Sequence, residues 1–527
     1  MKTRFFNTAG PIQPDLHYFL PPLERFDQDE LFGLIDARKY FVLHAPRQTG
    51  KTSCLLALRD ELNRRGEYAC VYANIETAQS ARENVTEAMR AILGEIASRA
   101  RETLGDTFPK ENFIRISEQN PAHLALNSLL TEWAEHSTKP LVLLLDEVDA
   151  LIGDTLISLL RQLRSGYDRR PSHFPSSVIL CGVRDVRDYR IHSSATKEVI
   201  TGGSAFNIKS KSLRLGNFTP EEIHRLYELH AEATGQMFEP DVFPLVWELT
   251  AGQPWLVNAL AYEACFEMKE YRDRTKPITT EVIQQAKERL ILRRDTHLDQ
   301  LADKLSEPRV RRVIEPILAG EGDPEKMPAD ELQYVRDLGL ITETRPVAIA
   351  NRIYQEVIPR ELTWSTQQYL VQDTAWYINA DGRLNLSQLL AAFQQFFREH
   401  SEHWVERFEY KEAGPQLLLQ AFLQRIVNGG GRIEREYGLG RKRTDLFLLW
   451  SYPGGVQRAV IELKILRQQP DETLARGLEQ TWGYADRCGA DEAHLVLFDI
   501  RSARSWEEKI YHRTGTYQGQ TIEVWGM

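Results

Sequence analysis

The sequence predicts an α/β protein, with a parallel sheet in its N-terminal part and a smaller mixed sheet in its C-terminal part. Residues 1–205 alternate continuous apolar runs with amphipathic stretches, which is the rhythm of parallel strands joined by helices. From about residue 406 the order changes to helix, strands, helix, strand. A chain of 527 residues is long enough for several domains, so each sheet can have a core of its own.

Four strands are expected in the N-terminal part, because four runs are apolar throughout, as in strands that helices cover on both faces. They are YFVLHA (40–45), ACVYANI (69–75), LVLLLD (141–146) and SVILCG (177–182). Farther along, Thr219 to Glu222 read as a capping box with a proline at the first helical position, so a helix should begin there.

The remaining regions are assigned from their patterns. Residues 291–362 combine short helices with two short strands, LGLITET and VAIANRIY, which suits a winged helix. A strong helix follows, in which Phe393, Phe396 and Phe397 form an apolar face. The expected domains are a core over 1–205, a helical lid over 206–290, a winged helix over 291–362, a helical linker over 363–405 and a C-terminal domain over 406–527.

Composition excludes several classes of protein. Hydrophobic residues make up 42% and charged residues 27% of the chain, which excludes a mostly disordered or fibrous protein. The net charge of -10 excludes an overall basic field, so nucleic acid would be bound only by local patches. The 5 cysteines lie far apart, which argues against a disulfide framework or a zinc site. With no apolar run of membrane-spanning length and no signal-peptide pattern, we expect a cytoplasmic protein without a membrane partner.

A phosphate-binding loop is predicted where residues 45–52 read APRQTGKT between a strand and a helix. Gly50 would let backbone N–H groups turn towards phosphate oxygens, Lys51 would reach the β- and γ-phosphates, and Thr52 would ligate Mg²⁺. An alanine replaces the first glycine of the motif, at the end of the strand. The candidate nucleotide-binding residues are Ala45, Pro46, Arg47, Gln48, Thr49, Gly50, Lys51, Thr52 and Ser53.

Two acidic residues end the apolar strand at 141–146 and supply the partner motif. Parallel strands bind ligands at their carboxyl ends, so Asp146 and Glu147 should lie beside the loop. Asp146 would hold Mg²⁺ through water, and Glu147 would orient and deprotonate the attacking water. Together the two motifs predict a nucleoside triphosphatase.

Over about residues 1–360 these motifs, with the DExD run of Asp146 to Asp149, resemble AAA-type and STAND-type ATPases, including archaeal ATPases. The resemblance implies ATP and Mg²⁺ as cofactors, with Lys51, Glu147 and Arg184 as catalytic residues, the last being a sensor after the fourth strand. It implies His17 and Arg25 beside the adenine.

The resemblance also implies a lid motif, Gly-x-Pro, at Gly252 and Pro254, although these residues could simply begin a helix after a turn. It further implies that an arginine from a neighbour in a homo-oligomer, or from the lid, completes the site, and the candidates are Arg184, Arg187 and Arg190; a monomer with all its arginines in cis is the alternative. A basic run in the winged-helix region could contact DNA or be a solvated helix face; it contains Arg309, Arg311 and Arg312.

A second constellation lies between residues 441 and 466. The turn SYPGG (451–455) predicts a hairpin, and the period of two along its second strand places Glu462 and Lys464 on one face. Asp445, on the first strand, can come beside them. Two carboxylates and a lysine can bind Mg²⁺ or Mn²⁺ and orient a water.

This region resembles the PD-(D/E)XK nuclease superfamily, which has a restriction-endonuclease-like fold, over roughly the last 120 residues. Asp445 takes the place of the first acid and Glu462-x-Lys464 that of the (D/E)xK pair, but Thr444 replaces the usual proline. The resemblance implies cleavage of nucleic acid, with DNA as the expected substrate, next to the basic run 441–443. Further site candidates are Glu412, Glu436, Gln480 and Tyr484.

Three interpretations remain open from the sequence. The first is an ATPase whose nucleotide state controls a C-terminal nuclease, in genome defence or DNA processing by analogy only. The second is an ATP-driven switch whose nuclease-like module only binds DNA or a partner. The third is a DNA-translocating motor, which would need a ring of subunits because no second motor domain is visible.

Overall fold

The computed structural model of the protein describes residues 4–185, 190–192, 199–293, 296–318, 325, 327–362, 377–407, 418–419, 422–423, 431–439, 442–466, 470–499, 501 and 504–527. The chain divides into two compact units. The first comprises Met1–His297 and Tyr334–Leu340, and the second comprises Leu298–Gln333 and Ile341–Met527.

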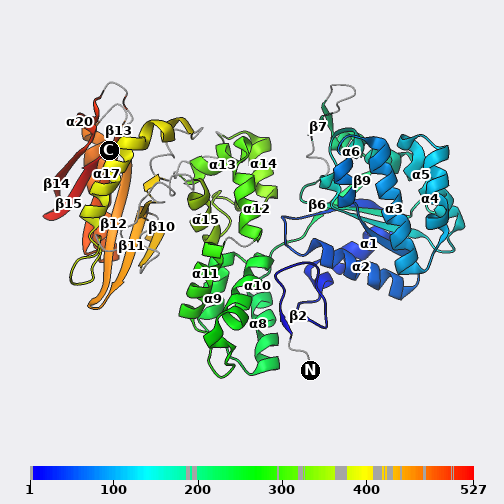
Figure 1. The fold of residues 1–527 in the computed structure, drawn as a ribbon, viewed down its shortest axis with the longest axis horizontal. Helices are drawn as coiled ribbons and strands as arrows, with labels where there is room; N and C mark the ends of the chain where they lie inside the picture. The colour runs from blue at the N-terminus through cyan, green and yellow to red at the C-terminus, as the bar shows by residue number, and fades with distance from the viewer. Residues whose placement is uncertain are drawn as a thin grey trace. The chain divides into compact units, whose positions relative to one another are not determined.

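The first unit is built on a five-stranded parallel sheet in the order β4-β5-β6-β3-β9 (Figure 1). Its strands are β3 (Tyr40–His44), β4 (Ala69–Asn74), β5 (Leu141–Asp146), β6 (Ser177–Gly182) and β9 (Lys209–Arg214). The four predicted strands are confirmed. The sequence did not reveal β9, because this edge strand reads KSKSLR and is largely polar, unlike the strands in the middle of the sheet.

Helices cover both faces of this sheet, as its apolar strands require. One core joins the sheet to α1 (Gln28–Asp36) and α2 (Lys51–Arg65). The opposite core joins it to α3 (Val85–Leu104), α5 (Ala122–His136) and α6 (Gly153–Ser165), and α4 (Phe108–Gln119) packs on α3 and α5 (Figure 1). Short elements join these parts: η1 (Pro22–Arg25), η2 (Glu76–Ala81), η3 (Val148–Ala150), η4 (Tyr167–Arg169), β7 (Arg190–His192), β8 (Val199–Thr201) and α7 (Gly202–Ala205).

A helical region completes the first unit. The predicted capping box is confirmed, since the Thr219 hydroxyl accepts from the Glu222 N–H and the Glu222 carboxylate accepts from the Thr219 N–H. The region contains α8 (Pro220–Thr234), α9 (Val242–Thr250), α10 (Pro254–Tyr262), the π-helix η6 (Glu263–Glu267), η7 (Lys269–Arg272) and α11 (Thr280–Arg293). The N-terminal segment adds β1 (Phe5–Phe6) and β2 (His17–Tyr18), which pair in parallel.

Four helices follow along the chain: α12 (Thr296–Leu305), α13 (Pro308–Leu318), α14 (Ala329–Asp337) and α15 (Arg352–Leu362). The two short strands expected before residue 360 are reduced, in the described chain, to one antiparallel bridge between Ile341 and Ile349. The run VAIANRIY ends inside α15, so its last three residues, Arg352 to Tyr354, are helical. The winged helix remains a prediction.

The second unit contains a six-stranded mixed sheet in the order β10-β11-β12-β13-β15-β14. The strands β12, β13 and β15 are parallel, and the outer pairings are antiparallel. The predicted hairpin is confirmed by the pairing of Tyr452 with Gly455. The strands are β10 (Gly431–Leu439), β11 (Lys442–Tyr452), β12 (Gly455–Leu466), β13 (Glu492–Asp499), β14 (Tyr511–Tyr517) and β15 (Gln520–Gly526).

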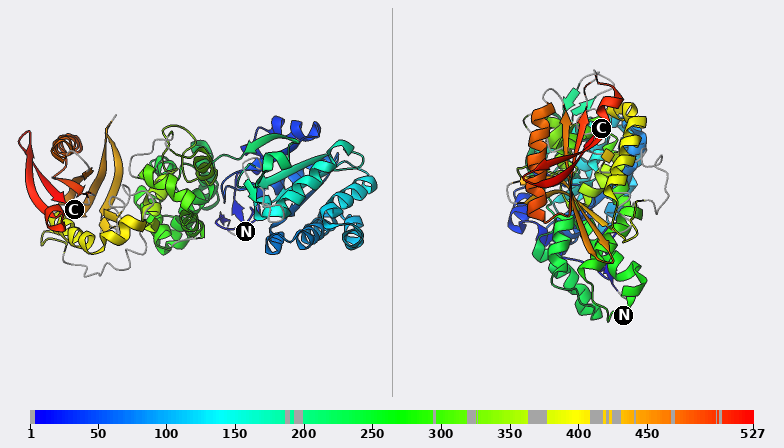
Figure 2. Two further views of the ribbon diagram at one scale, coloured as in Figure 1. Left: turned by 90° about the horizontal axis from the view of Figure 1, so that it is seen from above. Right: turned by 90° about the vertical axis from the view of Figure 1, so that its left-hand side faces the viewer.

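Two long helices, α19 (Pro470–Cys488) and α17 (Leu386–Arg407), flank this sheet (Figure 2). The apolar face predicted for α17 is confirmed, because Phe393 and Phe397 are buried and both rings contact Phe498 of β13. The short helix α20 (Trp506–Lys509) precedes β14.

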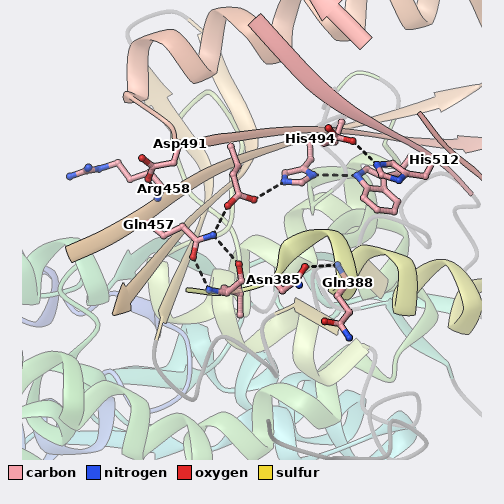
Figure 3. A network of polar contacts seen from close by, with 11 residues as sticks. Asn385, Gln388, Gln457, Arg458, Asp491, His494 and His512 are labelled. Carbon is pink, nitrogen blue, oxygen red and sulfur yellow. Dashed lines mark hydrogen bonds and ion pairs between the residues drawn. The ribbon is translucent and has the colours of Figure 1, made fainter. Parts of the chain in front are cut away.

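A chain of polar side chains crosses the sheet near the start of α17 (Figure 3). Gln457 forms two hydrogen bonds with the backbone of Leu384 and donates to Glu492 Oε1 at 2.7 Å. Glu492 also lies 3.4 Å from His494 Nε2, and Trp525 Nε1 donates to His494 Nδ1 at 3.2 Å. Because these groups bond to one another, the network joins the segment just before α17 to the strands β12, β13 and β15.

Candidate nucleotide and metal sites

The predicted phosphate loop lies between the end of β3 and the start of α2. Gly50 caps this helix with φ of 93°, a left-handed conformation that favours glycine. No side chain in the described chain caps the helix, so its first N–H groups face the loop without a side-chain acceptor. A helix start of this kind is an anion-binding site.

Lys51 is buried and folds back over the loop. Its Nζ donates to the carbonyl oxygens of Ala45 and Pro46, both at 3.0 Å. An ammonium group has three N–H donors, and these two bonds aim it at the centre of the loop. Arg47 is exposed, whereas Thr49 is buried and its hydroxyl donates to Pro46 O at 2.8 Å.

The two predicted Mg²⁺ ligands are brought together. Thr52 Oγ1 donates to Asp146 Oδ2 at 2.8 Å, although 94 residues separate them. Asp146 is fully buried, and its Oδ1 accepts from the Glu147 N–H at 3.0 Å. The Tyr72 hydroxyl also donates to Asp146 Oδ2, at 3.0 Å, and the sequence did not single out this tyrosine. The available signal was a phenol in an otherwise aliphatic strand.

Glu147 follows β5 in a left-handed conformation, with φ of 59°. Burial raises the pKa of its carboxyl group, and Asp149 acts in the same direction, whereas the Lys51 ammonium lowers it. Asp149 is itself held in place, because its Oδ1 accepts from the Val183 N–H at 3.3 Å. The charges of Asp149 and of the loop lysine therefore act in opposite directions on the pKa of the predicted base.

The predicted sensor, Arg184, follows β6 and pairs with an acid from a distant part of the chain. Its Nε lies 3.2 Å from Asp337 Oδ2 at the end of α14, and its guanidinium lies 4.9 Å from the ring centre of Tyr334. The neighbouring Gly339 approaches the loop so closely that a Cβ there would lie 2.7 Å from Pro46 Cγ. The sequence did not predict that residues 334–340 pack on the nucleotide side of the sheet.

Two further arginines were predicted after the sensor strand. Arg187 lies outside the described residues, and for Arg190 only the backbone, in β7, is described. Their contribution to a neighbouring subunit therefore remains a prediction.

Arg25, predicted beside the adenine, supports the phosphate loop directly. Its Nη1 donates to Thr49 O at 2.6 Å, and its Nη2 donates to Gly216 O. Its guanidinium also lies 4.8 Å from the ring centre of Phe218. Arg25 thus joins the loop to the segment that leads into α8, and its role in base binding stays a prediction.

His17 is buried in the N-terminal segment. Its Nδ1 accepts from the Gln13 N–H at 3.0 Å, its ring contacts Phe5, and burial lowers its pKa. The segment does reach the loop helix, because the Ile12 N–H donates to Ser53 Oγ at 3.0 Å. Contact of His17 with adenine also stays a prediction.

The Gly-x-Pro run begins α10 with Pro254 at its first turn. Gly252 has φ of 71°, and a Cβ there would overlap the carbonyl oxygen of Phe218. Next to the proline, Trp255 Nε1 donates to Thr8 O at 2.8 Å. The run thus begins a helix, as the simpler interpretation expects, and the adjacent Trp255 joins that helix to the N-terminal segment; the role of the run as a lid motif stays a prediction.

In the C-terminal sheet, Glu462 and Lys464 lie on one face of β12, with Lys464 Nζ 2.6 Å from Glu462 Oε1. Glu462 is buried. The register pairs Leu446 with Ile461, so Asp445 and Glu462 are the next residues along the two strands. On the other side of β11, Arg435 pairs with Leu446 and Tyr437 with Thr444, which places the Glu436 backbone beside that of Asp445.

For the other C-terminal candidates, the structure describes the side chains of some residues and not of others. The side chains of Asp445 and Glu436 lie outside the described residues, as do Glu412 and Arg441 entirely. Tyr484, on α19, packs in an apolar cluster with Phe447 and Val460. Gln480 Oε1 is buried and has no hydrogen-bond partner among the described residues. The described side chains alone contain no group of three or more metal-ligating residues.

The basic run of the winged-helix region is engaged in local contacts. Arg309 pairs with Glu307, Arg312 pairs with Glu331, and Arg311 Nε donates to Leu305 O at 2.9 Å. These contacts favour the solvated helix face over a ready DNA contact.

Comparison with known proteins follows this geometry. Residues 35–189 match the family model described as an AAA domain, and this segment is a P-loop ATPase domain of the AAA type. No curated protein matches the chain. In the part of the chain that the structure describes, no helix has the length and apolarity needed to span a membrane.

Solved structures show distant likenesses. The Walker-type ATPase PABY2304 of Pyrococcus abyssi has 13% identity and a TM-score of 0.47, over 67% of this chain and 99% of that protein. Cdc6p of Pyrobaculum aerophilum has 15% identity and a TM-score of 0.35, over 65% and 93%. The RuvB Holliday junction branch migration motor of Thermotoga maritima has 13% identity and a TM-score of 0.33, over 66% and 94%. With TM-scores below 0.5, these likenesses carry no functional inference.

Proposed function

We propose that this protein, whose residues 35–189 form an AAA-type P-loop domain, binds and hydrolyses ATP with Mg²⁺ at the loop of residues 45–52. The observation that carries the proposal is the convergence of three side chains: Lys51 over the loop carbonyls, and Thr52 hydrogen-bonded to Asp146 at 2.8 Å. A hydroxyl and a carboxylate are hard oxygen donors of the kind that Mg²⁺ prefers, so these residues fit the cation.

Each residue has a task in this proposal. The N–H groups at the start of α2 would bind the phosphates, and Lys51 would exchange two carbonyl partners for phosphate oxygens. Thr52 and Asp146 would hold Mg²⁺, which neutralises charge on the phosphates. Glu147 would orient water and accept its proton, and its raised pKa suits a base that works near neutral pH.

Nucleotide binding tests the proposal first. Isothermal titration with a slowly hydrolysed ATP analogue and Mg²⁺ should show binding to the full chain, and Lys51→Ala should weaken it at least about 100-fold, because a buried charge-assisted contact is lost. Lys139→Ala removes an exposed lysine of the same unit and should change nothing. Equal binding by Lys51→Ala and the unaltered chain would contradict the proposal.

A second candidate function rests on the ion pair between buried Glu462 and half-buried Lys464. We propose that this pair, with Asp445, forms a metal-dependent nuclease site. The order of β10, β11, β12, α19 and β13 supports it, because it agrees with the order of strands, helix and strand that the sequence predicts for the region resembling PD-(D/E)XK nucleases. A buried carboxylate held by one lysine is also a natural ligand for a divalent cation.

Plasmid cleavage tests this second function. With Mg²⁺ or Mn²⁺ the full chain should cut DNA, Glu462→Ala should lose metal binding and cutting, and Lys464→Ala should lose cutting alone. Glu472→Ala, which removes an acid of an exposed ion pair on α19, is the control. DNA binding without any cleavage would favour the non-catalytic module instead, and cleavage that survives both site substitutions would contradict the assignment.

A further inference from the structure

Tyr72 delivers a hydroxyl group to the metal side of the loop from the neighbouring strand. It lies on β4, where Cys70, Val71 and Ala73 are fully buried, and its ring belongs to the apolar core between the sheet, α1 and α2. The register pairs Tyr72 with Leu144 and Asn74 with Asp146, so Tyr72 and Asp146 point to the same face, two residues apart along the strands. The phenol therefore spans that gap, and its hydroxyl ends 3.0 Å from Asp146 Oδ2.

The two partners of Asp146 Oδ2 differ in what they can do when Mg²⁺ arrives. Thr52 is itself a proposed ligand, so a lone pair of its oxygen would bind the cation while its O–H, 2.8 Å from Asp146 Oδ2 in this structure, can still donate. Tyr72 is not a proposed ligand, so its hydroxyl would act on the metal only through Asp146. The Glu147 N–H, at 3.0 Å from Oδ1, stays in place because it is backbone.

We propose that Tyr72 is a positioning residue that holds the Asp146 carboxylate in the orientation in which it binds Mg²⁺, and that it thereby sets the Mg²⁺ affinity of the nucleotide complex. The inference rests on the proposed binding of Mg²⁺ with nucleotide. Partners that orient a metal-ligating carboxylate commonly matter about 10- to 100-fold in metal affinity. Burial raises the pKa of the Tyr72 phenol, and Asp146 acts in the same direction, so the hydroxyl remains a neutral donor.

A purely structural hydrogen bond is the alternative, and the same sheet offers a matched control. Tyr40, on β3, is also fully buried, and its hydroxyl donates to the carbonyl oxygen of Pro175 at 2.9 Å. It lies at the first residue of its strand, whereas the phosphate loop follows the last. Tyr40→Phe thus removes a comparable buried hydrogen bond away from the proposed metal ligands.

The test measures ADP affinity of the full chain by isothermal titration, first in EDTA and then across a range of Mg²⁺ concentrations. Tyr72→Phe should raise by about 10-fold the Mg²⁺ concentration that gives half of the Mg²⁺-dependent increase in ADP affinity. It should leave the ADP affinity in EDTA unchanged. Tyr40→Phe should change neither. Binding of Mn²⁺ to the ADP complex, followed by electron paramagnetic resonance, should weaken in Tyr72→Phe alone.

Several results would overturn the inference. If Tyr72→Phe needs no more Mg²⁺ than the unaltered chain to increase its ADP affinity, the hydroxyl does not orient Asp146. If Tyr72→Phe loses as much ADP affinity in EDTA as it loses with Mg²⁺, the hydroxyl has a structural role. In an Asp146→Asn background, Tyr72→Phe should add nothing, and a further change there would also contradict the inference. If the unaltered chain binds ADP without any effect of Mg²⁺, the proposed function itself fails. Titrations are run well below the Tm of each variant, so that reduced stability does not imitate lost affinity.

Discussion

Replacing Asp337 with asparagine removes the charge that faces Arg184 and keeps the shape of the side chain. The Asp337 side chain is only 1% exposed and that of Arg184 is 14% exposed, so solvent screens this pair weakly. A hydrogen bond to a charged group contributes about 1.5–3 kcal/mol to stability. We therefore expect Asp337→Asn to lower the free energy of unfolding by about that amount, measured by denaturant unfolding of the full chain.

The weaker contact between Arg184 and residue 337 in this variant should also increase its affinity for ATP. If Arg184 is the sensor, it must leave Asp337 to reach the terminal phosphate, and a weaker pair makes that step easier. A change of about 1.5–3 kcal/mol corresponds to about 10- to 150-fold, which is the upper limit of the expected gain. ADP lacks that phosphate, so its affinity should not change. Titration of both nucleotides in a Glu147→Gln background, which should not hydrolyse ATP, measures the two effects.

Glu331 provides the control, because it lies on the same helix as Asp337 and pairs with Arg312. Glu331→Gln should reduce stability without altering the affinity for either nucleotide. An Asp337→Asn variant that binds ATP no more tightly than the unaltered chain, or gains equally for ADP, would refute the role given to Arg184.

Two further predictions follow from the lid region. Gly252→Ala should destabilise the chain by more than the roughly 1–2 kcal/mol that a left-handed alanine costs, because its Cβ would overlap the Phe218 carbonyl oxygen. Gly235→Ala is the control, because Gly235 has φ of 78° and open space around the Cβ, so this variant should show the conformational cost alone in thermal unfolding. Burial lowers the pKa of His230 to about 4 from 6.5, so the unfolded chain takes up a proton that the folded chain refuses. Stability should therefore fall as the pH decreases from 6.5 towards 4, and His230→Phe should flatten that part of a pH series of Tm values.

Local patterns were sufficient for much of the fold. The strand at 141–146 is a continuous apolar run up to Asp146 because both faces of the sheet are covered, and this property is visible without any tertiary information. The hairpin at 451–455 and the shared face of Glu462 and Lys464 follow from turn chemistry and the period of two. By contrast, β9 is a largely polar strand at the edge of the sheet, so its sequence resembles a loop.

The parts of the site that could not be predicted depend on contacts between distant segments. Tyr72 reaches Asp146 only because β4 and β5 pair in one particular register, which the two strand sequences do not specify. Asp337 reaches Arg184 across 153 residues, and an acid near the end of an amphipathic helix has no distinguishing local signal. The phosphate loop and its acid were recognisable because each carries a fixed spacing of residue types.

Phosphate release by Glu147→Gln, compared with its nucleotide binding, tests most directly whether this loop is an ATPase site. The substitution removes the proposed base and leaves Thr52 and Asp146 in contact at 2.8 Å. The unaltered chain should release phosphate from ATP in the presence of Mg²⁺. Glu147→Gln should bind ATP at least as tightly and release phosphate at least about 100-fold more slowly. Normal turnover by this variant, or no turnover by the unaltered chain under conditions where it binds ATP and Mg²⁺, would contradict the proposed hydrolysis.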